Sequence, residues 1–114
     1  MAVKLALVVR ADLGMGRGKI AAQAAHAAVT AVLISREADV AAWLGEGQPK
    51  VVLKVPTGEE LLDLARQALA DGLVVEVVHD AGRTQVAPGT ATCCAIGPAD
   101  SERVDRVTAG LPLL

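Results

Sequence analysis

The first third of this sequence constrains the fold more than any other part. The run Leu5 to Val9 is short and apolar, which predicts a buried strand. Glycines alternate after it, at Gly14, Gly16 and Gly18, and an alanine-rich segment from about Lys19 to about Ala38 then predicts a long helix. Because its side chains are small, this helix can approach a sheet closely. A strand, a glycine-rich turn and a helix packed on a sheet are therefore expected.

The middle of the chain continues this alternation of helix and strand. Asp39 to Gly45 predicts a short second helix, and Lys50 to Val55 predicts a second strand. Thr57 is expected to cap a third helix, because Glu60 three residues later completes a capping box. Gly72 is expected to end that helix. Its predicted apolar stripe consists of Leu61, Leu64, Ala65, Ala68 and Leu69.

Two more strands and a last helix complete the predicted order. Leu73 to Val78 predicts the third strand, and Thr90 to Ile96 predicts the fourth. Gly97 and Pro98 are expected to break the fourth strand. Asp100 is expected to cap the last helix. The residues of that helix expected to face inward are Val104 and Val107.

The order of elements indicates an α/β fold. We expect one compact three-layer domain over residues 1–114, with a mixed four-stranded β-sheet flanked by helices. The chain has one Trp and neither Phe nor Tyr, so its core must consist of small and branched aliphatic side chains. The uncharged stretch Ile20 to Ser35 is too short and too polar to cross a bilayer, which predicts no membrane association.

Charge and cysteine content bound the function further. A formal net charge of −2 argues against a protein coated in positive charge, although it leaves room for a local basic patch. Cys93 and Cys94 are adjacent, and neighbours on a strand point to opposite faces, so a disulfide between them is not expected. The chain has no metal-binding cysteine spacing. Reduced cysteines favour a cytoplasmic location.

The glycine segment fails both common nucleotide-binding patterns. A phosphate-binding loop needs Ser or Thr after its lysine, but Ile20 follows Lys19. The dinucleotide fingerprint needs a third glycine where Lys19 stands. Two features remain. Alternating glycines let the backbone approach a ligand closely, and a helix N-terminus favours an anion. Lys19 stands at that terminus, where a cation is unfavourable for the helix dipole. A flexible turn with a surface lysine explains the pattern about equally well.

Polar residues recur on one face of the long helix. Lys19, Gln23, His26 and Thr30 are spaced so that they share a face. For Thr30 a solvated helix face is the simpler interpretation. For Gln23 and His26 a solvated face and a functional role remain open.

The segment Asp80 to Gln85 is the second candidate. It follows the predicted third strand directly, where functional groups of α/β sheets often lie. Asp80, Thr84 and Gln85 offer a base, a hydroxyl and an amide, and Arg83 offers a phosphate contact. An ordinary turn is the alternative interpretation, since Asp-Ala-Gly is common turn chemistry.

Together these segments resemble one family. The stretches GMGRGKIAAQAAHAA, QPKVVLKVP and DAGRTQVAPGT, followed by GPA and VTAGLPLL, are similar in order to the second family of peptidyl-tRNA hydrolases, found in archaea and eukaryotes. The resemblance covers essentially the whole chain, and the combination of the glycine segment with DAGRTQ is specific. The tail from Ala109 to Pro112 departs from the family's usual pattern.

The resemblance implies a function and a site. The family hydrolyses the ester between peptide and tRNA, which recycles tRNA from aborted translation, with no metal and no organic cofactor; many members are homodimers. Its catalytic residues fall on Lys19, Asp80 and Thr84. The matching candidates for substrate binding are Arg10, Gln23, His26 and Gln85, to which the residues themselves add Gly16, Arg17, Gly18 and Arg83.

The residues support a mechanism for ester hydrolysis. Asp80 is expected to orient or deprotonate a water, directly or through Thr84, while Lys19 stabilises the oxyanion. Attack by Thr84 itself is the less favoured alternative. Two rival functions remain: a non-catalytic RNA- or ribosome-binding module, and a protein-interaction module with Trp43 as its anchor. For Trp43 a place at the edge of the core is the simpler interpretation.

Overall fold

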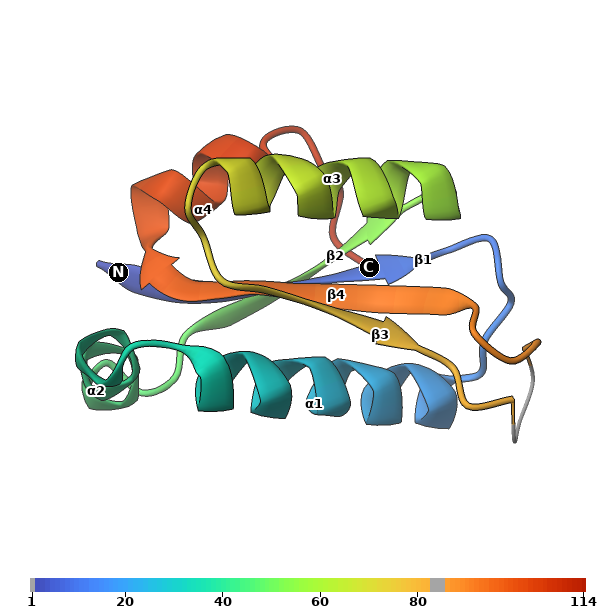
Figure 1. Ribbon diagram of the computed structural model, residues 1–114, viewed down its shortest axis with the longest axis horizontal. Coiled ribbons are helices and arrows are strands. Elements are labelled where there is room, and N and C mark those ends of the chain that lie inside the picture. Colours follow the sequence, from blue (N-terminus) through green and yellow to red (C-terminus); the bar gives the residue numbers. More distant parts are fainter. Residues whose placement is uncertain (1, 83–85) are drawn as a thin grey trace.

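In the computed structural model, which describes residues 2–82 and 86–114, four strands form one mixed sheet with helices on both faces (Figure 1). The strands are β1 (Val3–Arg10), β2 (Lys50–Val55), β3 (Val75–His79) and β4 (Ala91–Asp100). The helices are α1 (Arg17–Ile34), α2 (Glu37–Gly45), α3 (Gly58–Ala70) and α4 (Ser101–Thr108). The predicted fold class and order of elements are confirmed.

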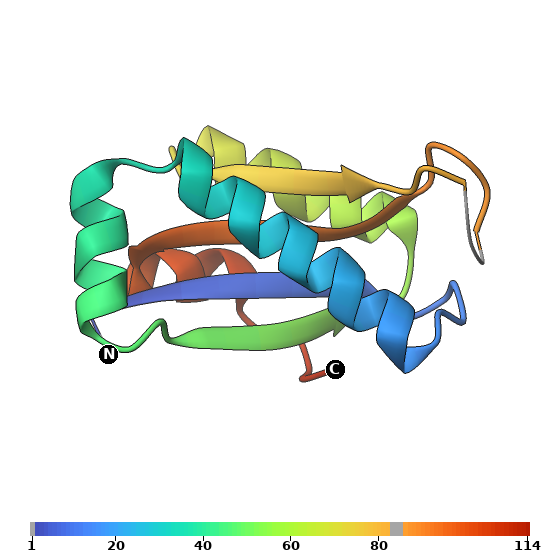
Figure 2. The same cartoon turned by 90° about the horizontal axis from the view of Figure 1, so that it is seen from below.

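The direction of the strands decides which loops meet. The sheet order is β2-β1-β4-β3. Strand β1 is parallel to β2 and antiparallel to β4, and β3 is also antiparallel to β4. Strands β1 and β3 therefore run in the same direction, and their carboxyl ends lie at one end of the sheet. Figures 1 and 2 both show the segment before α1 and the loop after β3 at that shared end.

The two faces of the sheet build separate halves of the core. Residues of β1 alternate between them: Leu7 and Val9 face the half formed with α1, and Val8 faces the half formed with α3 and α4. Ala27 and Ala31 of α1 are fully buried, because their small side chains let the helix lie close to the strands. Figure 1 shows this arrangement, with α1 and α2 on one face and α3 and α4 on the other.

The cysteines follow the same alternation. Cys93 packs in the half of the core beside α1, and Cys94 packs in the half beside α3. Both are buried and unbonded to each other, as the sequence predicted.

The boundary between the two predicted helices lies earlier than expected. Helix α1 ends at Ile34, and α2 begins at Glu37 rather than Asp39. The Ser35 hydroxyl donates a hydrogen bond to the Ala31 carbonyl at 2.6 Å, and both Ser35 and Arg36 have extended backbone angles. A serine that bonds back to the preceding turn competes with helix continuation, and here the chain turns after it. The prediction that one helix runs to Ala38 was wrong for this reason.

Strand β4 does not break where Gly97 and Pro98 predicted a break. It continues to Asp100, with Ala99 opposite Lys4 on β1. Gly97 has a φ of +100°, and a Cβ there would lie 2.8 Å from the Lys4 carbonyl oxygen. Because glycine has no Cβ, it fits this position, and β4 stays paired with β1 through a shift in register between Lys4 and Ala6.

The ends of α3 explain a smaller difference in β3. The Thr57 hydroxyl accepts a hydrogen bond from the Glu60 amide at 3.1 Å, so the predicted N-cap is confirmed. At the other end Gly72 has a φ of +80°, and the Leu73 amide donates to the Ala68 carbonyl at 3.0 Å. Leu73 therefore belongs to the helix terminus, and β3 begins at Val75 instead.

The apolar stripe of α3 is narrower than predicted. Its buried residues are Leu61, Leu64, Ala65 and Ala68. Leu69 is 58% exposed, because its position lies about a quarter of a turn from the centre of the stripe. In α4 the Asp100 carboxylate accepts from the Glu102 amide at 2.9 Å, which confirms that cap.

Within residues 2–82 and 86–114, no helix has the combination of length and apolar character that crossing a membrane requires.

Candidate functional site

The candidate site lies at the shared carboxyl end of β1 and β3. Lys19 stands in the first turn of α1, just after the glycine segment, and Asp80 directly follows β3. Strand β4 begins between them in the sheet and contributes Thr92. The fold thus brings two predicted residues together although they are 61 positions apart in the chain.

The Lys19 ammonium forms an ion pair with the Asp80 carboxylate through Oδ1. Both side chains are nearly withdrawn from solvent. Helix α1 has no acidic residue in its first turn, and Gly16 at its N-cap has no side chain to cap it. Asp80 therefore supplies, from another element, the negative charge that a helix N-terminus favours. The lysine that looked unfavourable in the sequence thus has its partner in the residue that follows β3.

The backbone around Asp80 holds the carboxylate in place. Oδ2 accepts a hydrogen bond from the Gly82 amide at 2.6 Å. The Asp80 amide donates to the Thr90 carbonyl at 2.8 Å, and the Gly89 amide donates to the Asp80 carbonyl at 2.8 Å. These last two bonds close the base of the loop between β3 and β4, so the position of Asp80 is fixed on both sides.

The same contacts keep Asp80 ionised. The hydrogen bond from Lys19 lowers the pKa of the Asp80 carboxyl below its ordinary value of 3.8, against the opposing effect of burial, and the Gly82 amide adds to the lowering. Asp80 is therefore a carboxylate near neutral pH, able to accept a hydrogen bond from a water or a hydroxyl group.

Gln23 is held one turn along α1 by a residue that sequence reasoning missed. The hydroxyl of Thr92, which is fully buried, donates to the Gln23 side-chain oxygen at 2.6 Å. With that oxygen engaged, the amide nitrogen of Gln23 is the end left to donate. A threonine inside an otherwise apolar buried strand was the signal in the sequence that could have indicated Thr92.

The other predicted residues of α1 have more solvent contact. Arg17 and Gly18 are exposed at the start of the helix, and Gly16 is half-buried. His26 is exposed as well. The structure therefore turns Lys19 and Gln23 toward the sheet, whereas His26 lies on the same helix facing solvent.

Arg10 lies at the end of β1 and makes several contacts within the chain. Its guanidinium binds both carboxylate oxygens of Asp12, at 3.0 and 2.7 Å. It also donates to the Ala91 carbonyl at 3.1 Å. The three remaining predicted residues, Arg83, Thr84 and Gln85, lie outside the described residues.

The cysteines near the site are poor nucleophiles. The Cys93 thiol donates to the Gln23 backbone carbonyl at 3.4 Å. Burial raises the pKa of Cys93 to about 11 and that of Cys94 to about 12. Both stay protonated near neutral pH. In the described part of the chain, His, Cys, Asp and Glu side chains do not gather in threes as a metal site would need.

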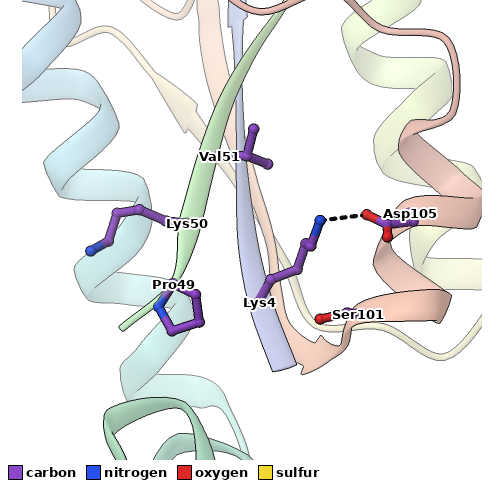
Figure 3. A pocket seen from close by; sticks show the side chains of 6 residues that line it. All are labelled: Lys4, Pro49, Lys50, Val51, Ser101 and Asp105. Atoms are coloured by element: carbon purple, nitrogen blue, oxygen red, sulfur yellow. Dashed lines mark hydrogen bonds and ion pairs between the residues drawn. The ribbon is translucent and has the colours of Figure 1, made fainter. Parts of the chain in front are cut away.

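A separate pocket of about 350 Å³ lies at the opposite end of β1 (Figure 3). Two of its charged groups pair with each other, since the Lys4 ammonium contacts the Asp105 carboxylate at 2.6 Å. The other residues that line it are Pro49, Lys50, Val51 and Ser101. This pocket is remote from Lys19 and Asp80, so it is not part of the site.

Comparison with solved structures supports the fold. A protein of unknown function from Agrobacterium tumefaciens aligns with a TM-score of 0.71 over 100% of this chain and 98% of that one, at 18% identity. At so low an identity the likeness concerns the fold alone.

Sequence comparison is more specific. A protein named peptidyl-tRNA hydrolase from Metallosphaera sedula is 50% identical over 98% of this chain and 100% of its own length. One of the same name from Methanopyrus kandleri is 53% identical over 97% of each chain. The family model described as peptidyl-tRNA hydrolase PTH2 matches residues 3–114. On this evidence the chain belongs to the peptidyl-tRNA hydrolase PTH2 family.

Proposed function

We propose that residues 1–114 act as one catalytic unit that hydrolyses the ester bond between peptide and tRNA in peptidyl-tRNA, recycling tRNA from aborted translation. The observation that carries the proposal is the buried ion pair of Lys19 and Asp80 at the end of the sheet, in a chain that belongs to this hydrolase family. The substrate is accordingly peptidyl-tRNA.

In the proposed mechanism Asp80 orients the nucleophile. Its ionised carboxylate accepts a hydrogen bond from the attacking water, directly or through Thr84. The water oxygen attacks the ester carbonyl carbon, and its proton passes by way of the carboxylate to the departing ribose oxygen. The carbon–oxygen bond to the ribose then breaks, which releases a peptide carboxylic acid and a tRNA with a free hydroxyl. Attack by the Thr84 hydroxyl is the alternative route to the same products.

Lys19 has the complementary role. In the resting site its ammonium pairs with Asp80, and as the carbonyl oxygen gains negative charge the ammonium stabilises it. The amide of Gly18 in the first turn of α1 and that of Gly16 at its N-cap lie at the same helix terminus, which favours negative charge. A cation and a helix N-terminus thus face the developing oxyanion together.

Gln23 is proposed to contact the substrate through its amide nitrogen, because Thr92 holds its oxygen. Arg17, which is exposed beside the site, is proposed to contact a tRNA phosphate. His26 and Gln85 are added to the proposed substrate-binding set on the family resemblance, and Arg83 is added as a phosphate contact. The chain lacks Phe and Tyr, so stacking of bases on those rings cannot contribute to binding.

The rival functions have less support. A binding module would not need a buried lysine–carboxylate pair. Trp43 is buried rather than displayed, and its indole nitrogen donates to the Pro49 carbonyl at 2.7 Å, so it is not available as an interface anchor.

We further propose that the protein acts in the cytoplasm, which its unbonded cysteines favour.

We also propose that the protein forms a homodimer. The support for the dimer is the family resemblance, together with apolar side chains exposed on α1 and α2, namely Val29, Leu33, Ile34 and Leu44. Light scattering of the purified chain is expected to give twice the monomer mass, and Leu33→Asp is expected to lower it. A monomeric mass for the unaltered chain at micromolar concentration would refute the dimer.

The catalytic proposal is tested by release of peptide from a labelled N-acyl-aminoacyl-tRNA, with and without EDTA. Asp80→Asn is expected to lower kcat by about 10² to 10⁴, the usual range for a general acid–base group. His79→Asn is the matched control, because His79 is exposed and adjacent. Full activity in Asp80→Asn, or none in a folded wild type, would overturn the proposal.

A further inference from the structure

Arg10 joins the two segments that carry the site. Its Nε and Nη2 atoms donate to the two carboxylate oxygens of Asp12, and its Nη1 atom donates to the carbonyl of Ala91. Asp12 belongs to the segment that leads into α1 and Lys19. Ala91 begins β4, immediately after the loop that Asp80 opens. One guanidinium therefore contacts the chain just before one catalytic residue and just after the loop of the other.

The surroundings of Arg10 fix its orientation. The side chain is 16% exposed, and its planar group is matched to a carboxylate in the two-bond arrangement that only arginine provides. The guanidinium also lies close to Gly58, the first residue of α3, where an added Cβ would be 2.6 Å from Nη1. Gly58 does not need a left-handed backbone, so the close approach of Arg10 is the reason that the structure gives for a glycine there.

These contacts leave Arg10 poorly suited to bind a phosphate. Its charge is balanced by Asp12, and its three donor atoms named above are engaged inside the chain. A tRNA phosphate would have to displace the Asp12 carboxylate first, whereas Arg17 at the start of α1 is exposed to solvent. The geometry thus separates Arg10 from the residues proposed to contact the substrate.

We infer that Arg10 is a positioning residue, which sets the distance between the Lys19 ammonium and the Asp80 carboxylate by holding the Asp12 segment against the start of β4. The inference rests on the proposed function and assigns Arg10 a role other than the substrate contact that the sequence suggested. Small displacements of reacting groups lower rates strongly, so a loosened site should lose turnover before it loses affinity.

Two variants test this role in different ways. Arg10→Lys keeps the charge and removes the two-bond contact with Asp12. Gly58→Ala leaves Arg10 intact and pushes its flexible end aside, while alanine in a helix is not itself unfavourable. Gly45→Ala is the control, because a Cβ there meets nothing within 4 Å and its backbone is ordinary. Melting temperature and circular dichroism establish that each variant is folded.

Both test variants are expected to lower kcat about tenfold with KM changed less than about threefold, and Gly45→Ala is expected to match the wild type. A rise in KM with kcat unchanged in both variants would overturn the inference and make Arg10 a substrate contact. Loss of melting temperature with unchanged kcat would also overturn it, since that result describes a purely structural residue.

A second measurement separates this inference from the proposed function. The Asp80 carboxyl is titrated by carbon NMR in the wild type and in both variants, which requires no substrate. If Arg10 sets the contact between Lys19 and Asp80, the pKa of Asp80 rises toward its ordinary value in both variants. An unchanged Asp80 pKa refutes the inference even if the wild type proves inactive, and inactivity of the wild type alone refutes only the proposed function.

Discussion

The Lys19 ammonium contacts the Asp80 carboxylate with 9% of one side chain and 2% of the other exposed to solvent. A buried ion pair is weak evidence for stability, because the cost of removing two charges from water offsets much of their attraction. Its place at the shared carboxyl end of β1 and β3, where functional groups of α/β sheets often lie, favours a functional explanation over a structural one. Because the hydrogen bond from Lys19 lowers the pKa of Asp80, replacing Lys19 should change how Asp80 titrates.

Replacing Lys19 by methionine should change both the rate and its pH dependence. In the unaltered chain the pKa of Asp80 lies below 3.8, so the carboxylate is lost only when the pH falls through that low value. Without the ammonium, burial is no longer opposed by Lys19 and the Asp80 pKa rises. We expect Lys19→Met to lower kcat by about 10² or more and to move the acidic limb of the pH–rate profile upward. Profiles of kcat/KM from about pH 4 to about pH 8 measure the shift.

Lys4→Met is the control for this experiment. Lys4 is also ion-paired, to Asp105 at 2.6 Å, but it lies at the opposite end of β1. Its loss should leave kcat and the acidic limb unchanged. An acidic limb that is identical in Lys19→Met and the wild type would show that Asp80 does not titrate as part of the catalytic step.

The contact between Thr92 and Gln23 predicts a second effect. Thr92→Val keeps the shape of the side chain and leaves the Gln23 oxygen without its 2.6 Å partner. We expect a loss of about 1 to 3 kcal/mol in the free energy of unfolding, together with a lower kcat, because Gln23 is no longer held. Thr92→Ser retains the hydroxyl and should restore kcat. Denaturant unfolding and peptide-release kinetics provide the two readouts.

A second buried threonine separates stability from function here. The Thr108 hydroxyl donates to the Val104 carbonyl at 3.0 Å in α4, away from the site. Thr108→Val should therefore reduce stability without reducing kcat. If both valine variants lower stability and neither lowers kcat, Thr92 has no role in positioning Gln23.

What the sequence predicted well was local. Thr57 and Glu60 lie three residues apart and form the helix start that their spacing indicated. Strand β2 has the predicted bounds, Lys50–Val55, since turn-forming residues flank an apolar run. The failures also concerned short segments, but distant residues decided their structure. Gly97 was predicted to end a strand, whereas pairing with β1 both before and after Gly97 carries the strand through it.

The site depends even more on contacts between residues that are distant in the sequence. The spacing of Lys19 and Gln23 on one helix face could be inferred from helix geometry, but their partners Asp80 and Thr92 are 61 and 69 positions away. Within the sequence, only the family resemblance links Lys19 with Asp80. The ion pair of Arg10 and Asp12 was within reach of the sequence, since the two residues are two positions apart, whereas the contact with Ala91 depends on the antiparallel pairing of β1 and β4.

The cap of α3 gives a prediction about stability alone. Thr57→Ala removes the hydroxyl that accepts from the Glu60 amide at 3.1 Å. Loss of such a cap costs about 1 kcal/mol, and α3 lies on the face of the sheet opposite α1. We expect a lower midpoint in denaturant unfolding with kcat and KM unchanged. A change in kcat at unchanged stability would contradict the separation of the two faces.

Binding of tRNA should depend steeply on salt, with a contribution that can be assigned to Arg17. The chain carries a net charge of −2, so attraction to phosphates must come from a few local cations rather than from the whole surface. Each phosphate contact adds about 0.7 to 0.9 to the slope of log affinity against log salt. Arg17→Gln is expected to reduce the slope by about that amount, measured by KM over a series of salt concentrations. Arg36→Gln is the control, because Arg36 is exposed but lies beyond the far end of α1 and pairs with Asp39 at 3.1 Å. A slope that is the same in both variants would remove Arg17 from the phosphate contacts, and a flat slope in the wild type would mean that phosphates do not dominate binding.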